Sequence, residues 1–200
     1  MSIPEKQVRA VYDDKTIRIY QAFNHAIANA ALKQGTFTSP PFKIDRMTWI
    51  KPSFLWMMYR CGWAKKDKGQ ERVLAIDISR DGFEWALNNS LLAKSRHKYN
   101  DKKEWLALKE NTPVRIQWDP ERDFFFQPLD HRSIQVGLCR DAVKKYVNEW
   151  IVHIEDVTEL TFNIHKQVEE DNISAATLLL PNEKPYPLPN DIKIKVGIGG

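Results

Sequence analysis

The residues best suited to chemistry gather in the segment DRMTWIKPSFLWMMYR at positions 45–60, which mixes cations with aromatic side chains. Lys51 and Ser53 stand directly before an apolar pattern with helical spacing. A helix beginning there presents free backbone N–H groups, which together with the Ser53 hydroxyl and the Lys51 ammonium favour a bound phosphate or carboxylate. The apolar residues of this helix have the spacing of a core-facing stripe. The candidate binding residues of the segment are Trp49, Lys51, Ser53, Tyr59 and Arg60.

A second candidate lies in the segment TIRIYQA at positions 16–22, whose β-branched and aromatic residues predict a strand. Strand alternation places Arg18 and Tyr20 on one face and Gln21 on the other. If the strand is central, Arg18 needs an anionic partner, either internal or bound, because an unpaired buried charge is costly. If it is an edge strand, Arg18 is exposed to solvent.

The segment RSIQVGL at positions 132–138 predicts a later strand with an unusual face. Ser133, Gln135 and Gly137 share that face, which is therefore small and polar. Such a face suits a ligand that approaches the backbone closely at Gly137. A sheet face open to water has the same pattern. Arg132 adds a cation at the start of this strand.

Several familiar site motifs are missing from the chain. It has no glycine-rich phosphate loop, dinucleotide-binding fingerprint, zinc-protease motif or nucleophile elbow. The five histidines are scattered without ligand spacing, and Cys61 and Cys139 have no C-x-x-C companion. We therefore expect no bound metal and no disulfide framework, and a reducing compartment fits best.

Alternating strand and helix patterns must position the candidate residues. Expected strands cover residues 16–22, 47–51, 71–78, 113–118, 122–126, 132–138 and 150–154. Expected helices cover residues 25–34, 54–61, 80–89, 141–149, 158–170 and 173–180. Asp101 to Glu104 has the spacing of a capping box for a further short helix, and Asp119-Pro120 predicts a hairpin turn. The order of elements predicts an α+β fold with a mixed, mostly antiparallel sheet and flanking helices.

The length of 200 residues and the hydrophobic content of 42% predict a single compact domain with one core. We assign residues 1–180 to this domain and residues 181–200 to a proline-rich C-terminal tail, either an extended wrap or a loose end. No apolar run is long enough to span a membrane, and the first residues lack an apolar leader. We therefore expect a soluble, cytoplasmic protein with no membrane partner.

The net charge of +4 is unevenly distributed along the chain. Residues 43–103 hold 14 Lys and Arg against 7 Asp and Glu, so the rest of the chain is net acidic. A continuous basic surface that attracts anions is one interpretation of this bias. An ordinary solvated charged face is the other.

Several stretches that span nearly the whole chain resemble the domain-of-unknown-function family 4291. They are RAVYDDKTIRIYQAFN, DRMTWIKPSFLWMMYRCGWA, ERVLAIDISRDGFEWAL, PVRIQWDPERD, RSIQVGL and YVNEWIVHIEDVT. This resemblance implies no activity. The order of an early strand with Arg, Tyr and Gln, a strand-to-Ser junction and a late polar strand is also similar to the three-motif layout of ADP-ribosyltransferases. That similarity implies a split sheet with NAD bound in a cleft between its two halves.

The second resemblance implies a role for each candidate residue. Arg18 would hold the phosphates of NAD, and Gln135 would hold the ribose. Tyr20 or Tyr59 would stack on the nicotinamide, and Ser53 would position it. The third motif of those enzymes is commonly Glu, whereas Gln135 keeps the hydrogen bond but cannot act as a base. The expected nucleotide site is completed by Gln21, Trp49, Lys51, Arg60 and Arg132. NAD would be a substrate, with the ADP-ribose acceptor left open and nucleic acid among the candidates.

Two other functions fit the same residues. Lys and Arg interleaved with Trp49, Trp56, Tyr59 and Trp63 favour a protein that binds or modifies RNA or DNA through a basic aromatic surface. A non-catalytic interaction domain is the third interpretation, with the tryptophans in the core or at a partner interface. Binding of NAD, of nucleic acid or of neither distinguishes the three.

Overall fold

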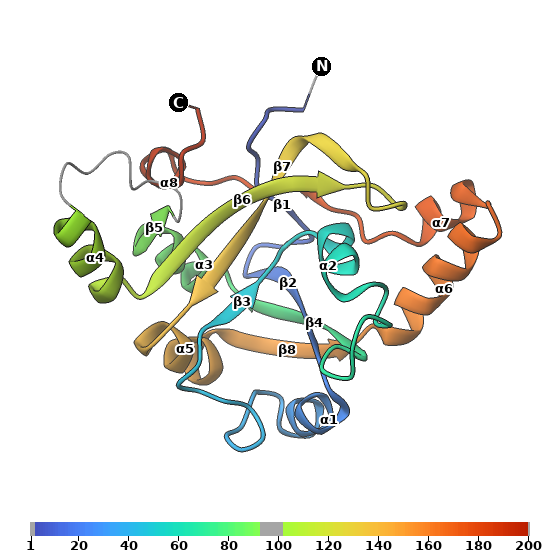
Figure 1. Cartoon of the computed structure of the whole chain (residues 1–200), viewed down its shortest axis with the longest axis horizontal. Helices are drawn as coiled ribbons and strands as arrows, with labels where there is room; N and C mark the ends of the chain where they lie inside the picture. Colours follow the sequence, from blue (N-terminus) through green and yellow to red (C-terminus); the bar gives the residue numbers. More distant parts are fainter. Residues whose placement is uncertain (1–2, 93–101, 200) are drawn as a thin grey trace.

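Two sheets carry the fold, which a computed structural model describes over residues 3–92 and 102–199. The antiparallel three-stranded sheet has the order β2 (Thr16–Phe23), β4 (Arg72–Ser79) and β8 (Ile151–Asp156). The four-stranded sheet has the order β3 (Thr48–Ile50), β7 (Pro128–Leu138), β6 (Val114–Arg122) and β5 (Ser90–Leu92). Only the β5–β6 pair among these is parallel. The predicted single α+β domain with a mixed, mostly antiparallel split sheet is confirmed (Figure 1).

The two sheets meet where β2 passes β3. The backbone N–H of Tyr20 donates to the carbonyl of Lys51 over 2.7 Å, and these two residues form an isolated antiparallel bridge. Lys51 follows β3 directly, so the bridge ties the edge strand of one sheet to the edge strand of the other. The residues directly after Lys51 therefore lie beside both sheets.

Local capping chemistry sets the helices beside this seam. Asn24 accepts from the Ile27 N–H at the start of α1 (His25–Gln34), and Ser53 Oγ accepts from the Trp56 N–H at the start of α2 (Phe54–Cys61). Both helices end at a glycine with positive φ, the backbone region that a side chain disfavours. Ser79 caps α3 (Arg80–Asn88) in the same way. These three predicted helices are confirmed.

The hairpin of β6 and β7 differs from the sequence expectation. The predicted turn at Asp119-Pro120 is wrong, because β6 continues through both residues and turns only at Asp123 to Gln127. There the Asp123 carboxylate accepts from the N–H groups of Phe125 and Gln127. Proline lacks an N–H for the strand ladder, and the register shift between Pro120 and Arg122 accommodates it inside the strand. Asp119 is thereby a strand residue.

The other predicted helices agree in place with the structure. They are α5 (Asp141–Lys145), which continues as a π-helical turn at Tyr146–Trp150, α6 (Thr158–Glu169) and α7 (Ile173–Leu179). A further helix, α4, covers Lys102–Asn111. The expected capping residue Asp101 lies outside the described residues. No helix in the described ranges is long and apolar enough to cross a membrane.

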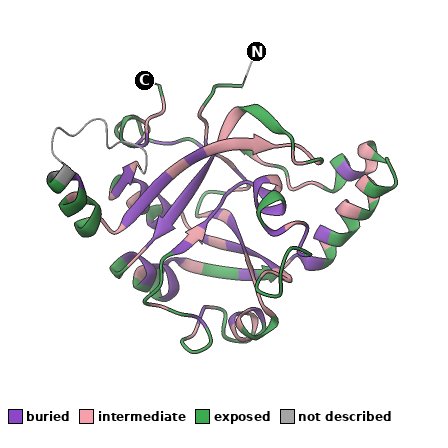
Figure 2. Ribbon diagram, in the orientation of Figure 1, coloured by how far each residue is buried: buried purple, intermediate pink, exposed green. Residues whose placement is uncertain are grey.

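The C-terminal segment is built into the domain. Strand β9 (Lys184–Pro185) pairs with β1 (Arg9–Ala10), and α8 (Asn190–Val196) follows. Tyr186 is buried and its hydroxyl donates to Glu84, while the Val196 carbonyl accepts from the Trp118 indole. Of the C-terminal segment that was expected to be an extended wrap or a loose end, residues 181–199 are described, and four of their apolar side chains are buried in the core: Tyr186, Leu188, Ile192 and Val196. Figure 2 shows buried strands at the centre and the more exposed α6 and α7 at one end.

Candidate functional site

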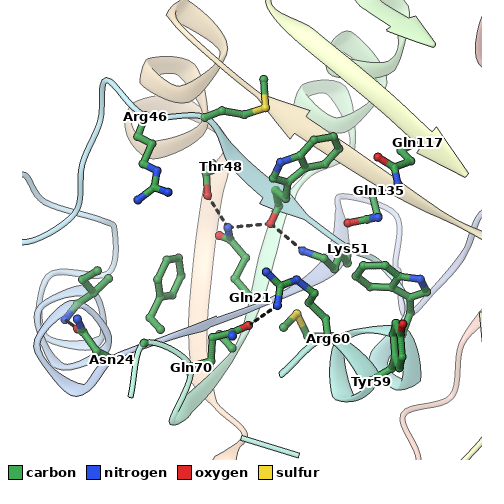
Figure 3. A pocket seen from close by; sticks show the side chains of 18 of the residues that line it. Gln21, Asn24, Arg46, Thr48, Lys51, Tyr59, Arg60, Gln70, Gln117 and Gln135 are labelled. Carbon is green, nitrogen blue, oxygen red and sulfur yellow. Dashed lines mark hydrogen bonds between the residues drawn. The ribbon is translucent and has the colours of Figure 1, made fainter. Parts of the chain in front are cut away.

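A cleft of about 900 Å³ opens between the two sheets. Its walls come from the end of β2, from β3, from the facing strands β6 and β7, from α2, and from the loops around residues 41–47 and 69–70. Figure 3 shows the side chains of these elements pointing toward a common space. Ligand pockets in proteins commonly have volumes of roughly 300–1,000 Å³. The cleft is therefore large enough for a small organic ligand.

Gln21 fixes the seam at the base of the cleft. Its amide nitrogen donates to Thr48 Oγ1 over 2.7 Å and to the Trp49 carbonyl over 3.0 Å (Figure 3). Its oxygen accepts from the Tyr146 hydroxyl over 2.8 Å. The side chain is buried, and these bonds join β2 to β3. Gln21 thus holds the two sheets at a defined separation, and it also lines the cleft.

Lys51 is a buried cation of the cleft with little hydrogen bonding to its ammonium in the described residues. Its side chain is only 5% exposed, and its one hydrogen bond among the described residues is a long contact of 3.4 Å to the Trp49 carbonyl. Its ammonium lies 5.3 Å from the centre of the Trp56 ring. Burial, followed by the nearby charge of Arg60, lowers the pKa of Lys51 to about 7. A buried ammonium with unused hydrogen-bond donors attracts an anion, because pairing with the anion compensates for the hydration energy that the charge lost on burial.

The charge of the lining favours anionic ligands. Five cations face the cleft within the described chain, and Asp119 is the one carboxylate among its lining residues there. The cations are Lys43, Arg46, Lys51, Arg60 and Arg122. Arg60 has a 3.3 Å hydrogen bond to Gln70 and no carboxylate partner in the described residues. Because cations outnumber carboxylates along this lining, its electrostatic potential favours phosphate and carboxylate groups.

An aromatic wall stands beside these cations. Trp56 and Tyr59 lie on α2 with their rings edge to face, and the Arg122 guanidinium covers the Tyr59 ring at 4.1 Å. Tyr59 is 37% exposed and Trp56 is buried. The indole N–H of Trp56 has no hydrogen-bond partner in the described chain. Buried donors are nearly always paired in native proteins, so this one marks a place for a ligand atom or water.

Gln135 reaches the cleft from β7 and bonds with residues of β6. It lies opposite Gln117 in the strand register, and its amide nitrogen donates to Asp119 Oδ2. Gln117 donates to the other oxygen of Asp119 over 2.8 Å. The sequence singled out Gln135 but missed Asp119, because Asp-Pro is a strong turn signal. The alternation from Gln117 to Asp119 along one strand face was the signal that could have found it.

The structure separates the predicted residues into two groups. Gln21, Trp49, Lys51, Tyr59, Arg60 and Gln135 all line the cleft. Arg18, Tyr20, Ser53 and Arg132 do not line it. Arg18 forms a two-pronged pair with Asp77 and lies 3.3 Å from Glu155, and Arg132 pairs with Glu5.

Tyr20 and Ser53 contribute to structure beside the cleft. Tyr20 packs edge to face on Phe54 in a buried apolar cluster, and Ser53 is the buried cap of α2. The space above Gly137, expected to receive a ligand, is filled by the Trp49 ring, whose nearest atom would lie 2.9 Å from an added Cβ. The close approach predicted at Gly137 is therefore made by a side chain of the protein itself.

Among the described residues, no group of three or more His, Cys, Asp or Glu is placed to hold a metal ion.

One comparison with known proteins covers almost the whole chain. A search of curated proteins finds no match to the chain. The model of the family described as "Domain of unknown function (DUF4291)" matches residues 7–186. The stretches that resembled this family lie within that match, and the chain belongs to the DUF4291 family.

Proposed function

We propose that the cleft binds NAD and that the protein is an ADP-ribosyltransferase-like enzyme. One observation carries the proposal: the three strands singled out by the resemblance, β2, β3 and β7, converge on one cleft between two sheets. Gln21, Trp49 and Gln135 come from these strands, and Lys51 directly follows β3. The cleft volume of about 900 Å³ leaves room for a ligand of dinucleotide size.

The chemistry of the walls suits the parts of NAD. The pyrophosphate carries two negative charges, for which Lys51 and Arg60 supply buried and exposed cations on the same side of the cleft. The exposed ring of Tyr59 offers a stacking surface for nicotinamide or adenine. The Gln135 amide, already beside a carboxylate, is placed to bond ribose hydroxyls. In this assignment Arg18 stabilises the sheet through Asp77 and does not contact the phosphates.

Transfer in such a site rests on positioning and electrostatics. The bond between ribose C1′ and the nicotinamide nitrogen breaks through an oxocarbenium-like transition state, and the departing ring regains neutrality. Transfer therefore requires a fixed ribose and a negative group near C1′. In this assignment Asp119, the one carboxylate that lines the cleft among the described residues, would supply that charge. The acceptor takes up the ribosyl carbon from the open side of the cleft.

Isothermal titration with NAD tests the proposal, with ADP-ribose and nicotinamide as partial ligands. We expect NAD and ADP-ribose to bind and nicotinamide alone to bind weakly, because the cations recognise the pyrophosphate. Lys51→Met should weaken both nucleotide titrations about 30-fold, which is the loss of one charge-assisted contact of roughly 2 kcal/mol. Lys195→Met, an exposed lysine of α8 outside the cleft, is the matched control. Absence of NAD binding to the wild-type protein refutes the proposal.

A second candidate function is nucleic-acid binding, favoured by the exposed Tyr59 ring between Trp56 and Arg122. Lys43 and Arg46 add two further cations to the lining of the cleft. A single strand would stack its bases on Tyr59 and bring its phosphates to these cations. Titration with a short RNA at several salt concentrations separates the two functions. Steeply salt-dependent RNA binding without NAD binding selects the second, and silence from both ligands selects a non-catalytic interaction domain.

A further inference from the structure

Asp119 holds a distinct position in the cleft. Within the described chain it is the only carboxylate that lines this space, among five cations. It lies on β6, half-buried, two residues after Gln117 and on the same strand face. From the sequence alone Asp119 was expected only to form a turn, whereas in the structure it is a strand residue.

Both oxygens of Asp119 are held by amide donors. Gln117 Nε2 donates to Oδ1 over 2.8 Å, and Gln135 Nε2 donates to Oδ2. The two glutamines face each other across the β6–β7 ladder, so the strand pairing itself fixes the carboxylate between them. Each oxygen accepts one of these bonds and keeps a second lone pair for another donor. Neither glutamine can take a proton at neutral pH, whereas the carboxylate can.

The surroundings orient this carboxylate. Two amide donors hold its oxygens, and the charge of Asp119 favours the ammonium form of Lys51. No salt bridge of Asp119 with a cation occurs within 4 Å in the described part of the chain. A carboxylate that is fixed but not neutralised by contact is the arrangement that a general base requires.

We propose that Asp119 is the catalytic base of the transfer, with Gln117 and Gln135 as its positioning residues; this rests on the proposed function. The acceptor oxygen forms a bond with ribose C1′ while the bond from C1′ to the nicotinamide nitrogen breaks. The electron pair of that bond passes into the nicotinamide ring and neutralises it. The proton of the acceptor hydroxyl moves to the Asp119 carboxylate and from there to solvent. With water as acceptor, the products are ADP-ribose, nicotinamide and one proton.

Nicotinamide release from NAD, with water as acceptor, tests the role of Asp119. Asp119→Asn should lower kcat about 10²- to 10⁴-fold, the usual contribution of a general base, and leave the Kd for NAD within about threefold. Glu121→Gln is the matched control, because Glu121 lies on the same strand and does not line the cleft. A wild-type rate in Asp119→Asn overturns the inference and leaves the proposed function standing. NAD binding without nicotinamide release by the wild type also overturns it, whereas absent NAD binding refutes the proposed function itself.

Rescue by a conservative variant separates catalysis from a structural role. Asp119→Glu should restore part of the nicotinamide release lost in Asp119→Asn, because it returns a carboxylate to this position. An Asp119→Glu protein that binds NAD but is no faster than Asp119→Asn contradicts the assignment of Asp119 as the base.

Discussion

Arg18 and Lys51 are both cations inside the fold, and their surroundings are opposite. Arg18 on β2 has two hydrogen bonds to Asp77 and a further carboxylate, Glu155, at 3.3 Å. Lys51, beside the same strand, has one long bond to a carbonyl and no carboxylate within 4 Å in the described residues. The first region is electrostatically complete without a ligand. The second lacks a carboxylate partner for its cation, which is the pattern expected of the proposed binding site.

The pKa values of the two cations express the same contrast. The Asp77 hydrogen bonds raise the pKa of Arg18 above its ordinary value, whereas burial lowers that of Lys51 to about 7. The fold therefore stabilises the charge of Arg18 and penalises the charge of Lys51. Substitutions at the two positions should separate stability from binding.

The largest effect is expected from Arg18→Ala. Loss of the guanidinium leaves Asp77 partly buried without its partner, which should lower the free energy of unfolding by about 2–3 kcal/mol. NAD affinity should stay unchanged. Urea unfolding and calorimetric titration of the same preparation measure both quantities. Lost NAD binding at unchanged stability would instead make Arg18 the phosphate ligand that the resemblance implied.

Lys51→Met should show the reverse pattern. The variant removes a charge whose burial is costly and keeps an apolar chain of similar length, so its free energy of unfolding should equal or exceed that of the wild type. The nucleotide titrations should weaken by about 2 kcal/mol, as one charge-assisted contact is lost. A strongly destabilised Lys51→Met protein would show that this ammonium is part of the folded structure and would erase the contrast with Arg18.

The pH dependence of NAD binding sharpens the contrast further. With a pKa of about 7 in the free protein, Lys51 is about nine-tenths charged at pH 6 and about one-tenth charged at pH 8. The anion binds the charged form, so affinity should fall about tenfold over this range as pH rises, with proton uptake on binding near pH 7. Arg60 opposes the charge of Lys51, and Asp119 and Cys61 favour it. Lys51→Met should abolish the dependence, and a flat wild-type profile contradicts this role.

The smallest effect is expected from Tyr59→Leu. The ring is partly exposed and shares its face with Arg122, so its loss should cost about 1 kcal/mol of ligand stacking, or roughly fivefold in Kd. Phe162→Leu on α6 is the control, because that ring has a similar exposed fraction and does not line the cleft. If Tyr59→Leu and the wild type bind NAD with the same Kd, the Tyr59 ring does not contact the ligand.

Short-range signals explain which parts of the fold could be predicted. The limits of α1 and α2 follow from Asn24 and Ser53 as caps and from glycines at the opposite ends, all within a few residues. The partner of Arg18 could not be found this way, because Asp77 is 59 residues away and reaches it only through the β2–β4 register. The sequence therefore located the strand of Arg18 but not the group that neutralises it.

The candidate site was predictable in its strands and incomplete in its residues. Gln135 was found from the polar face of its own strand. Asp119 was missed because its role depends on a register shift at Pro120 and on a glutamine of the neighbouring strand. Local turn preference and long-range pairing conflicted at this position, and the pairing prevailed.

The pairing of β1 with β9 bears on how the chain folds during synthesis. Residues 9–10 emerge first and wait for residues 184–185, and the apolar surface that Tyr186 and Val196 cover stays open until then. At roughly 5–20 residues per second, a ribosome takes about 10 s or more to make the intervening chain. All strands that form the cleft are complete before this closure. Until the C-terminal residues are made, this part of the core surface has no cover, and exposed apolar surface of that kind makes incomplete chains prone to aggregate.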